Sequence, residues 1–409
     1  MAQLLADNAL LAELDVLDNG MPKRFADYTM AMSEEIAGYY AGWPSKLDGM
    51  VHSSGEDFMV YTTREPIGVC AAIVPWNGPA AAAVWKIVPA VACGNSIVLK
   101  PAEQTPMSAI VLGELCLEAG IPPGVVNVVQ GTGETVGKAL VDHPGVDKVA
   151  FTGSTETGRL IGAAAASTLK RVTLELGGKG ANVVFADADL HAAAIGAAAT
   201  AWGNSGQACL AGTRLLVERS VHDEFLGMVI ELTRKMKLGS GFDPAVTMGP
   251  LVSRVQFERV SGYIALGQQE GALLAYAGDR PDGPGWFVSP TIFTGVRNDM
   301  RIAQEEIFGP VLSVIPFDTE DEAYAIANGT QFGLAGAVWT SDVGRAHRAG
   351  RAIRSGVVWI NSYGEILTNV PYGGMKQSGY GRELGQGSLD IFTESKSVYL
   401  RLAPAQVPG

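Results

Sequence analysis

The sequence lacks the features of a disulfide-rich, metal-binding or nucleic-acid-binding protein. Only four of its 409 residues are cysteines and none forms a C-x-x-C pair, so we expect neither a disulfide framework nor a metal site. Thirty basic residues stand against 42 acidic ones, giving a net charge of −12, and no basic tract is dense enough to neutralise phosphates. Nucleic acid is therefore not expected as a partner.

Long apolar runs are also absent. The most apolar segment, residues 69–99, is interrupted by several prolines and asparagines and by Lys86, so it is typical of a buried core rather than of a lipid span. Where a secretory signal peptide would be basic and then apolar, the N-terminus carries Asp7, Glu13, Asp15 and Asp18. We therefore expect a cytoplasmic protein that does not contact a membrane.

What the sequence does contain is an alternation of β-branched runs and Ala-rich stretches, which is typical of parallel sheets with crossover helices. The length indicates two or more domains. In the first domain we predict strands at residues 69–74, 96–99, 125–129 and 149–152. Helices are predicted at residues 80–92, 106–119 and 135–141. A second α/β domain is expected to begin near Gly177, with strands at residues 182–185, 214–217, 289–293, 309–316 and 357–361. Leucines at helical spacing also predict one helix over residues 4–17 that docks by its leucine face, with acidic residues between the leucines.

One stretch offers a nucleophile and a base. Asn204-Ser-Gly-Gln-Ala-Cys209 follows a segment that contains Glu175, and no histidine lies between His191 and His222. A cysteine of ordinary pKa is mostly thiol at neutral pH, so a catalytic one needs an activating neighbour, which a buried glutamate could supply. Glycines 203 and 206 predict a tight loop before the cysteine. The alternative is that Cys209 is an ordinary buried apolar residue.

A dinucleotide-binding turn is suggested by Phe151-Thr-Gly-Ser-Thr-Glu-Thr-Gly158, where a strand should pass into a helix. Its spacing is not G-x-G-x-x-G, so the pattern alone leaves open both nucleotide binding and an ordinary turn. After another predicted strand, Lys100-Pro-Ala-Glu103 offers a cation and an acid that could hold ribose hydroxyls, although such charges are often only solvated.

Seven motifs occur in the order in which one enzyme family carries them: Pro75-Trp-Asn77, Lys100-Pro-Ala-Glu103, Phe151-Thr-Gly-Ser154, Leu174-Glu-Leu-Gly-Gly-Lys179, Gly206-Gln-Ala-Cys209, Glu306-Ile-Phe-Gly-Pro310 and Gly381-Arg-Glu383. From about residue 10 to residue 400 the chain resembles the NAD(P)-dependent aldehyde dehydrogenases. The resemblance implies an α/β fold with a doubly wound cofactor-binding domain, an α/β catalytic domain and a small β oligomerisation arm. It places the cofactor-binding domain at residues 1–47 and 67–176, the arm at 48–66 and 393–404, the catalytic domain at 177–375 and a return to the cofactor domain at 376–392.

By matching positions, the resemblance implies that Cys209 adds to an aldehyde to form a thiohemiacetal and then a thioester. Glu175 would activate the water that hydrolyses the thioester. The Asn77 amide and the Cys209 backbone N–H would hold the oxyanion, while Lys86 and Glu383 would belong to a proton-handling network.

The cofactor implied by the resemblance is NAD. The residues expected to hold it are Trp76, Lys100, Glu103, Gly153, Ser154, Glu306 and Phe308. Glu306 would bind the nicotinamide ribose beside Phe308, and Lys100 with Glu103 would bind the adenine ribose. Because an ionised Glu103 accepts from a 2′-hydroxyl but repels a 2′-phosphate, it favours NAD over NADP.

Several questions stay open at this stage. Gly78 stands where the family commonly has an aromatic residue, and the loop at residues 362–370 matches no particular substrate class, so the aldehyde is not identified.

Members of the family usually carry tens of residues before the first helical stretch, so we expect an N-terminally short member, whether natural or truncated. A CoA-acylating semialdehyde dehydrogenase, which lacks the glutamate base, a non-catalytic relative and an NAD-free thioesterase remain alternatives. A homodimer or homotetramer is expected.

Overall fold

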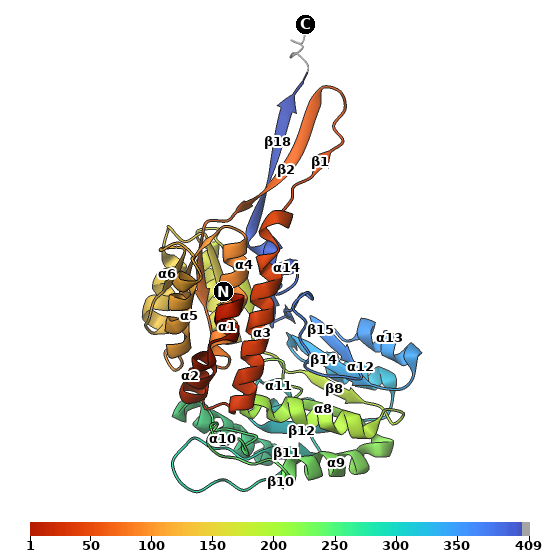
Figure 1. Ribbon diagram of the computed structural model, residues 1–409. Coiled ribbons are helices and arrows are strands. Elements are labelled where there is room, and N and C mark those ends of the chain that lie inside the picture. Colours follow the sequence, from red (N-terminus) through yellow and green to blue (C-terminus); the bar gives the residue numbers. More distant parts are fainter. Residues whose placement is uncertain (403–409) are drawn as a thin grey trace.

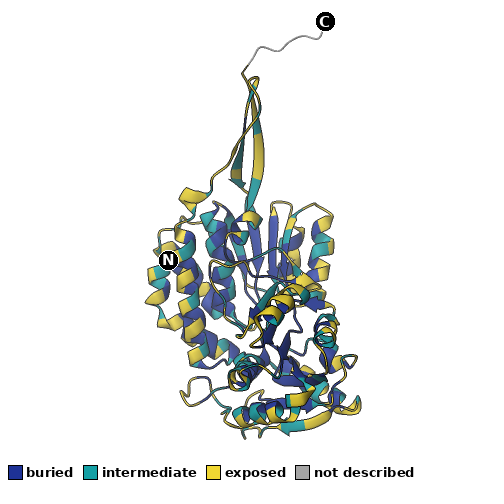
Figure 2. Ribbon diagram, turned by 90° about the vertical axis from the view of Figure 1, so that its right-hand side faces the viewer, coloured by how far each residue is buried: buried dark blue, intermediate teal, exposed yellow. Residues whose placement is uncertain are grey.

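Two open sheets flanked by helices and one protruding three-stranded arm make up the protein (Figure 1). The computed structural model describes residues 1–402. The strands of the two large sheets are mostly buried, whereas the arm is largely exposed (Figure 2). Within residues 1–402 no helix combines the length and the apolar character that a membrane span needs.

The first sheet has six strands. Their spatial order is β17 (Gly379–Tyr380), β7 (Arg171–Glu175), β6 (Lys148–Thr152), β3 (Val69–Ile73), β4 (Ser96–Lys100) and β5 (Val126–Val128). All neighbours are parallel except β17, which runs antiparallel to β7. Alternate residues of β3 enter two different cores, since Cys70 and Ala72 pack on the side of α4 (Pro79–Ala92) and α5 (Met107–Glu118). Ala71 and Ile73 pack on the side of α6 (Lys138–Asp142) and α7 (Thr155–Ala166). A π turn (Gly133–Gly137) comes directly before α6.

The second sheet has seven strands. Their order is β10 (Leu273–Ala277), β11 (Thr291–Thr294), β12 (Val311–Phe317), β9 (Arg214–Glu218), β8 (Ala181–Val184), β14 (Ala335–Trp339) and β15 (Val357–Ile360). Only β10 is antiparallel to its neighbour. One face is covered by α8 (Leu190–Trp202) and α9 (His222–Arg234), and the other by α10 (Arg254–Gln269), α11 (Arg301–Gln304), α12 (Glu320–Asn328) and α13 (Val343–Ala352). The predicted α/β fold class is confirmed.

Four strands of the two large sheets were not among those predicted: β7, β10, β14 and the two-residue β17. The strand β7 mixes polar and apolar residues, β14 is built from Ala and Gly with one Val and one Trp, and β10 lies half-exposed at the sheet edge. None of these patterns gives a clear local strand signal, and the strands exist because the neighbouring strands pair with them. Short elements complete the fold: η1 (Pro44–Lys46), η3 (Gly203–Gly206), η4 (Arg219–Val221), β13 (Phe332–Gly333), β16 (Met375–Lys376) and α14 (Gly387–Ile391).

The single helix predicted over residues 4–17 is wrong. The chain forms α1 (Ala2–Ala6) and α2 (Ala9–Asn19), followed by α3 (Lys23–Ala41), and the side chain of Asn8 caps α2 by accepting from the Leu11 amide at 3.3 Å. An asparagine at this position satisfies a free amide of the new helix, so it starts α2 rather than continuing α1.

The predicted docking face of this segment is also wrong in part. Leu17 is exposed, whereas Asp15 and Asn19 of α2 are buried. The Asp15 carboxylate accepts from the Ala80 amide at 3.3 Å, in the first turn of α4, and the Asp18 carboxylate accepts from the Met107 amide at 3.0 Å at the start of α5. Carboxylates placed at two helix N-termini explain why acidic residues, and not only leucines, dock this helix.

The arm contains β1 (Val51–His52), β2 (Phe58–Pro66) and β18 (Thr393–Arg401). Within residues 48–66, where the arm is expected, β1 and β2 form an antiparallel hairpin with Val51 opposite Tyr61. The C-terminal strand lies antiparallel to β2 of its own chain, from Thr393 opposite Pro66 to Arg401 opposite Phe58. Among the described residues the other edge of β18 has no neighbouring strand.

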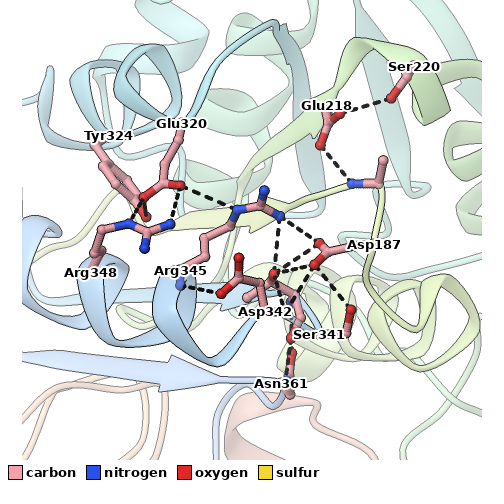
Figure 3. A network of polar contacts seen from close by, with 12 residues as sticks. Asp187, Glu218, Ser220, Glu320, Tyr324, Ser341, Asp342, Arg345, Arg348 and Asn361 are labelled. Carbon is pink, nitrogen blue, oxygen red and sulfur yellow. Dashed lines mark hydrogen bonds and ion pairs between the residues drawn. The ribbon is translucent and has the colours of Figure 1, made fainter.

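A network of ion pairs ties α12 and α13 to the loop after β8 (Figure 3). Arg348 binds the Glu320 carboxylate through two nitrogens at 2.7 and 2.9 Å. Arg345 binds Asp187 at 2.8 Å and lies over the ring of Phe185, with 4.3 Å between the guanidinium carbon and the ring centre. Chiefly because Arg348 donates to it, Glu320 has its pKa lowered to about 2.

Replacing Arg348 by Met is therefore expected to lower the free energy of unfolding near pH 7 slightly but measurably, because solvent screens this exposed guanidinium. The folded-state pKa of Glu320 is depressed, so its contribution is complete above the ordinary value of 4.5 and is lost as the pH falls toward 2. Urea unfolding at several pH values would show the difference between the proteins shrinking with acid. Arg351→Met on the same helix is the control, and an equal loss in both variants would contradict the pairing.

Candidate active site

Cys209 follows a tight loop at the end of α8. The loop passes through the left-handed region at Asn204, Ser205 and Gly206, with φ of 47°, 58° and 71°. A Cβ on Gly206 would lie 2.3 Å from the backbone of Gly309, so only glycine allows the two segments to approach this closely. The predicted tight loop is confirmed, and it fixes the backbone that leads to the cysteine.

The side chain of Cys209 is partly buried and contacts a tyrosine. Its Sγ is 3.7 Å from the hydroxyl oxygen of Tyr372. Burial, together with the nearby carboxyl groups of Glu306 and Glu175, raises the pKa of the Cys209 thiol to about 12, against an opposing contribution from the Tyr372 hydrogen bond. The resting cysteine is thus a thiol, and its use as a nucleophile requires a base or a bound group that favours the thiolate.

Asn77 lies beside this cysteine loop. The Asn77 side-chain amide donates to the backbone carbonyl of Gln207 at 2.9 Å. The Asn77 backbone carbonyl accepts from the side-chain amide of Asn204 at 2.7 Å. On the other side, the side chain of Asn19 donates to the carbonyl of Trp76 at 2.9 Å. The segment between β3 and α4 is therefore held from two directions, with the amide of Asn77 turned toward the residues that precede Cys209.

Glu175 ends β7 and is buried, with an exposed fraction of 5%. Neither of its carboxylate oxygens makes a hydrogen bond of normal geometry with any residue from 1 to 402, and a Cβ on Gly373 would lie 2.5 Å from Oε1. Burial, followed by the charge of Glu383, raises the pKa of Glu175 well above its usual range, although Lys86, Arg382 and the backbone of Gly374 oppose the rise. A carboxylate desolvated in this way is a stronger base when ionised.

Lys86 and Glu383 form a buried ion pair behind Glu175. Lys86 lies on α4, whereas Glu383 pairs through its backbone with Tyr372, so the pair joins two segments that are almost 300 residues apart. Charged groups this deep persist only when they are paired, and both influence the charge of Glu175.

One cavity of about 440 Å³ collects most of the candidate residues. Its lining includes Trp76, Asn77, Gly153, Ser154, Glu175, Cys209, Glu306 and Phe308. These residues come from five separate stretches of the sequence. A larger cavity of about 560 Å³ lies at the base of the arm and contains none of them, so size alone does not locate the site.

The far wall of the cavity is built by Glu306, Phe308 and Trp76. Glu306 Oε1 accepts from the backbone amide of Gly178 at 2.8 Å, and burial raises the pKa of Glu306 to about 7. A Cβ on Gly178 would lie 2.3 Å from the carbonyl oxygen of Cys209, so this turn packs directly against the cysteine. The rings of Phe308 and Trp76 meet edge to face with 5.2 Å between their centres.

The chemistry of the lining suits a dinucleotide. The helix α7 starts at the cavity with Ser154 as its N-cap, and the first amides of a helix are free donors for phosphate oxygens. Arg159 and Arg259 line the same cavity and supply positive charge. The cavity volume of about 440 Å³ is in the range of nucleotide pockets. An aromatic pair and a carboxylate lie at one end of the cavity.

Lys100 and Glu103 do not line this cavity. They follow β4, the strand beside β3, where Lys100 Nζ donates to the Pro101 carbonyl at 2.8 Å and lies 3.5 Å from Glu103 Oε2. Lys100 is buried, whereas the Glu103 side chain is about half exposed, at 48%. The carboxylate is therefore accessible to a ligand that extends along the ends of the strands.

Sequence reasoning missed Tyr372, whose hydroxyl contacts the nucleophilic sulfur. It lies 163 positions after Cys209, in a stretch with glycines at 373 and 374 that were not assigned a role. Paired glycines next to an aromatic residue do indicate close backbone packing, but no spacing rule connects them to a cysteine in another segment.

Sequence comparison gives the family. The profile of the aldehyde dehydrogenase family matches residues 1–398. An aldehyde dehydrogenase of Emericella nidulans is 48% identical over 396 residues, which cover 97% of this chain and 80% of the relative. Human retinal dehydrogenase 2 is 45% identical over 403 residues, covering 97% and 77%.

Comparison with solved structures gives the same family. An NAD-dependent aldehyde dehydrogenase from Sinorhizobium meliloti superimposes with a TM-score of 0.97 at 42% identity, over 99% of this chain and 81% of that one. The NAD⁺ complex of an aldehyde dehydrogenase from Bacillus cereus gives the same TM-score at 45% identity, over 98% and 82%. With the family profile, the close relatives and the shared fold in agreement, this chain belongs to the aldehyde dehydrogenase family.

Proposed function

We propose that this protein is an NAD-dependent oxidoreductase that converts an aldehyde to a carboxylic acid through an intermediate bound to Cys209. The observation that carries the proposal is the convergence of Cys209, Asn77 and Glu175 on one cavity from three distant segments. A thiol, an amide donor and a buried carboxyl group are the nucleophile, oxyanion ligand and base that acyl chemistry needs.

In the first step the Cys209 sulfur, having given its proton to the Glu175 carboxylate, bonds to the carbonyl carbon of the aldehyde. The carbonyl oxygen gains the negative charge and accepts from the Asn77 side chain and the Cys209 backbone N–H. Donors preorganised in this way are worth about 2.7–4 kcal/mol each in other enzymes. The links of Asn77 to Gln207 and Asn204 keep its amide in place before substrate arrives.

When bound, NAD supplies the acceptor for the hydride that leaves the tetrahedral carbon. On this chain the carbon becomes a thioester of Cys209, and the oxyanion returns to a carbonyl. Glu175, after releasing the thiol proton to solvent, takes a proton from water as the water oxygen bonds to the thioester carbon. The C–S bond then breaks to release the acid, and the proton held by Glu175 passes to the sulfur and restores the thiol. Lys86 and Glu383 lie where they can adjust the charge of Glu175 between the two proton transfers.

The cofactor would lie with its diphosphate at Gly153, Ser154 and the start of α7 and its nicotinamide ribose at Glu306, beside Phe308 and Trp76. Lys100 and Glu103 would hold the adenine ribose. Two facts support this placement: Glu306 is fixed by the Gly178 amide, and the half-exposed Glu103 carboxylate is available to a hydroxyl.

Replacing Glu103 by Ser is expected to narrow the preference for NAD over NADP about tenfold, because the carboxylate that repels a 2′-phosphate is gone while its half-exposed position limits the effect. The measurement is kcat/KM for both cofactors. Glu118→Ser, the same charge change at the end of α5, is the control. A wild-type enzyme that prefers NADP would defeat the charge argument.

We also assign the domains: residues 1–47 and 67–176 with 376–392 bind the cofactor, residues 177–375 carry the nucleophile, and residues 48–66 with 393–404 form the arm. Of the last range, residues 403 and 404 lie outside the described part of the chain. The assignment is supported by β17, which adds residues 379–380 to the first sheet. The free thiol of Cys209 suits a reducing compartment such as the cytoplasm.

The arm supports assembly into a homodimer or homotetramer. The outer edge of β18 has no strand beside it within residues 1–402, and Tyr399 and Leu400 are exposed. Light scattering at micromolar concentration is expected to give two or four times the mass of one chain. A monomer under these conditions would contradict the assignment.

The experiment that tests the function is a screen of aliphatic, aromatic and amino aldehydes with NAD, followed by the absorbance of reduced nicotinamide. Oxidation without added CoA, with the free acid as product, is the expected result. A strict requirement for CoA would identify an acylating dehydrogenase, and thioester hydrolysis without NAD would identify a thioesterase.

A further inference from the structure

We propose that Tyr372 is a further catalytic residue, whose phenol O–H donates a hydrogen bond to Cys209 Sγ and stabilises the thiolate that attacks the aldehyde. This inference rests on the proposed role of Cys209. The site described so far contains Asn77 and Glu175 beside the cysteine. Tyr372 is a further polar side chain, and it contacts the reacting sulfur.

The contact joins a buried phenol to a partly buried thiol. The hydroxyl oxygen lies 3.7 Å from Sγ, within the range of hydrogen bonds to sulfur, and Tyr372 has an exposed fraction of 7%. Within residues 1–402 the sulfur is the only hydrogen-bond partner of this hydroxyl. A buried hydroxyl without a partner is costly, so the Tyr372 phenol is committed to the sulfur.

The position of the phenol is fixed by its backbone and by its ring. The Tyr372 amide donates to the Glu383 carbonyl at 2.6 Å, and the Glu383 amide donates back at 2.7 Å. The ring meets Trp85 edge to face, with 5.5 Å between centres and 82° between planes. Because both backbone and ring are held, the hydroxyl is aimed at the sulfur before substrate binds.

The charges around the sulfur give this bond its importance. The carboxyl groups of Glu306 and Glu175 and the burial of the site all disfavour a thiolate, whereas the Tyr372 hydrogen bond favours it. Burial raises the pKa of Tyr372 well above its usual range, so the phenol keeps its proton and acts as a donor. A hydrogen bond to an ionised acceptor is stronger than one to a neutral acceptor, so the bond strengthens when the thiol loses its proton.

The test is the pH dependence of Cys209 alkylation by iodoacetamide in Tyr372→Phe. We expect the pKa of the thiol to rise by about one unit, which makes the thiolate about tenfold scarcer. Since each thiolate is then about threefold more nucleophilic, alkylation should slow about threefold at every pH below the pKa. Mass spectrometry of the peptide that contains Cys209 reports this site alone.

The matched control is Tyr363→Phe. Tyr363 is also buried near the cysteine, but its hydroxyl donates to the Leu210 carbonyl at 2.8 Å and not to the sulfur. The control should leave the alkylation rate unchanged. Equal slowing in both variants, or no slowing in Tyr372→Phe, would overturn the proposal.

A second probe covers the case in which Tyr372→Phe does not fold, as judged by its thermal melt. Incorporation of 3,5-difluorotyrosine at position 372 makes the phenol a stronger donor, and the alkylation profile should then move to lower pH. An unmoved profile would overturn the proposal. Neither measurement uses aldehyde or NAD, so failure of the proposed dehydrogenase activity would appear separately, as a wild-type protein that does not oxidise aldehydes.

Discussion

Cys209→Ser is expected to lower kcat for aldehyde oxidation by at least about 10⁴-fold, because loss of a covalent nucleophile removes the whole intermediate pathway. A serine hydroxyl is far less acidic than a thiol, and none of the described residues that line the cavity is a histidine that could activate it. Calorimetry should still give NAD binding with little change in affinity, since the cofactor contacts proposed here are made by other residues.

The control for this variant is Cys116→Ser. Cys116 is buried in α5, and burial raises the pKa of its thiol to about 11. That substitution should cost stability but leave turnover per folded enzyme close to wild type. Turnover that survives in Cys209→Ser, or disappears in Cys116→Ser without loss of folding, would place the nucleophile elsewhere.

Glu175→Gln is expected to separate the two halves of the reaction. The cysteine can still reach its thioester, slowly, because water or hydroxide can take the thiol proton, but hydrolysis lacks its positioned base. The signature is a burst of about one equivalent of reduced cofactor per site, followed by turnover reduced about 10³-fold.

The pH dependence gives a second signature of the same residue. A base works in its ionised form, and burial raises the pKa of Glu175, so wild-type hydrolysis should increase with pH through that raised value. The increase should be absent from Glu175→Gln. Glu156→Gln is the control, because Glu156 lines the same cavity near α7. No burst in Glu175→Gln would mean that the thioester cannot form without Glu175, and would leave its separate role in hydrolysis unsupported.

The sequence predicts the sheets where local pattern and tertiary role agree. Strands such as β3 and β4, made of β-branched and small apolar residues, are readable because both of their faces are buried. The strand β14 cannot be predicted in this way, because its Ala-Gly-Ala stretch has little β propensity. It becomes a strand only because it pairs with β8 and β15.

The site was predictable where chemistry is carried by a motif, and not where it depends on packing. Cys209, Glu175 and Asn77 stand in recognisable motifs, and the fold brings them to one cavity. Asp15 looked like a solvated residue of an amphipathic helix, yet it is buried at the start of α4. The glycines after Tyr372 indicate close packing, but nothing in the local sequence connects Tyr372 to Cys209. Contacts of this kind arise from chain segments that meet only in the folded protein.

In the proposed mechanism the substrate carbon becomes bonded to Cys209. The most direct measurement is peptide mass spectrometry of Glu175→Gln after brief incubation with NAD and an aldehyde that the wild-type protein oxidises. We expect one acyl group, of the mass of the acid less one hydroxyl, on the peptide that contains Cys209. Formation of a full equivalent of reduced cofactor with no acyl group on Cys209, or with the acyl group on another residue, would contradict it.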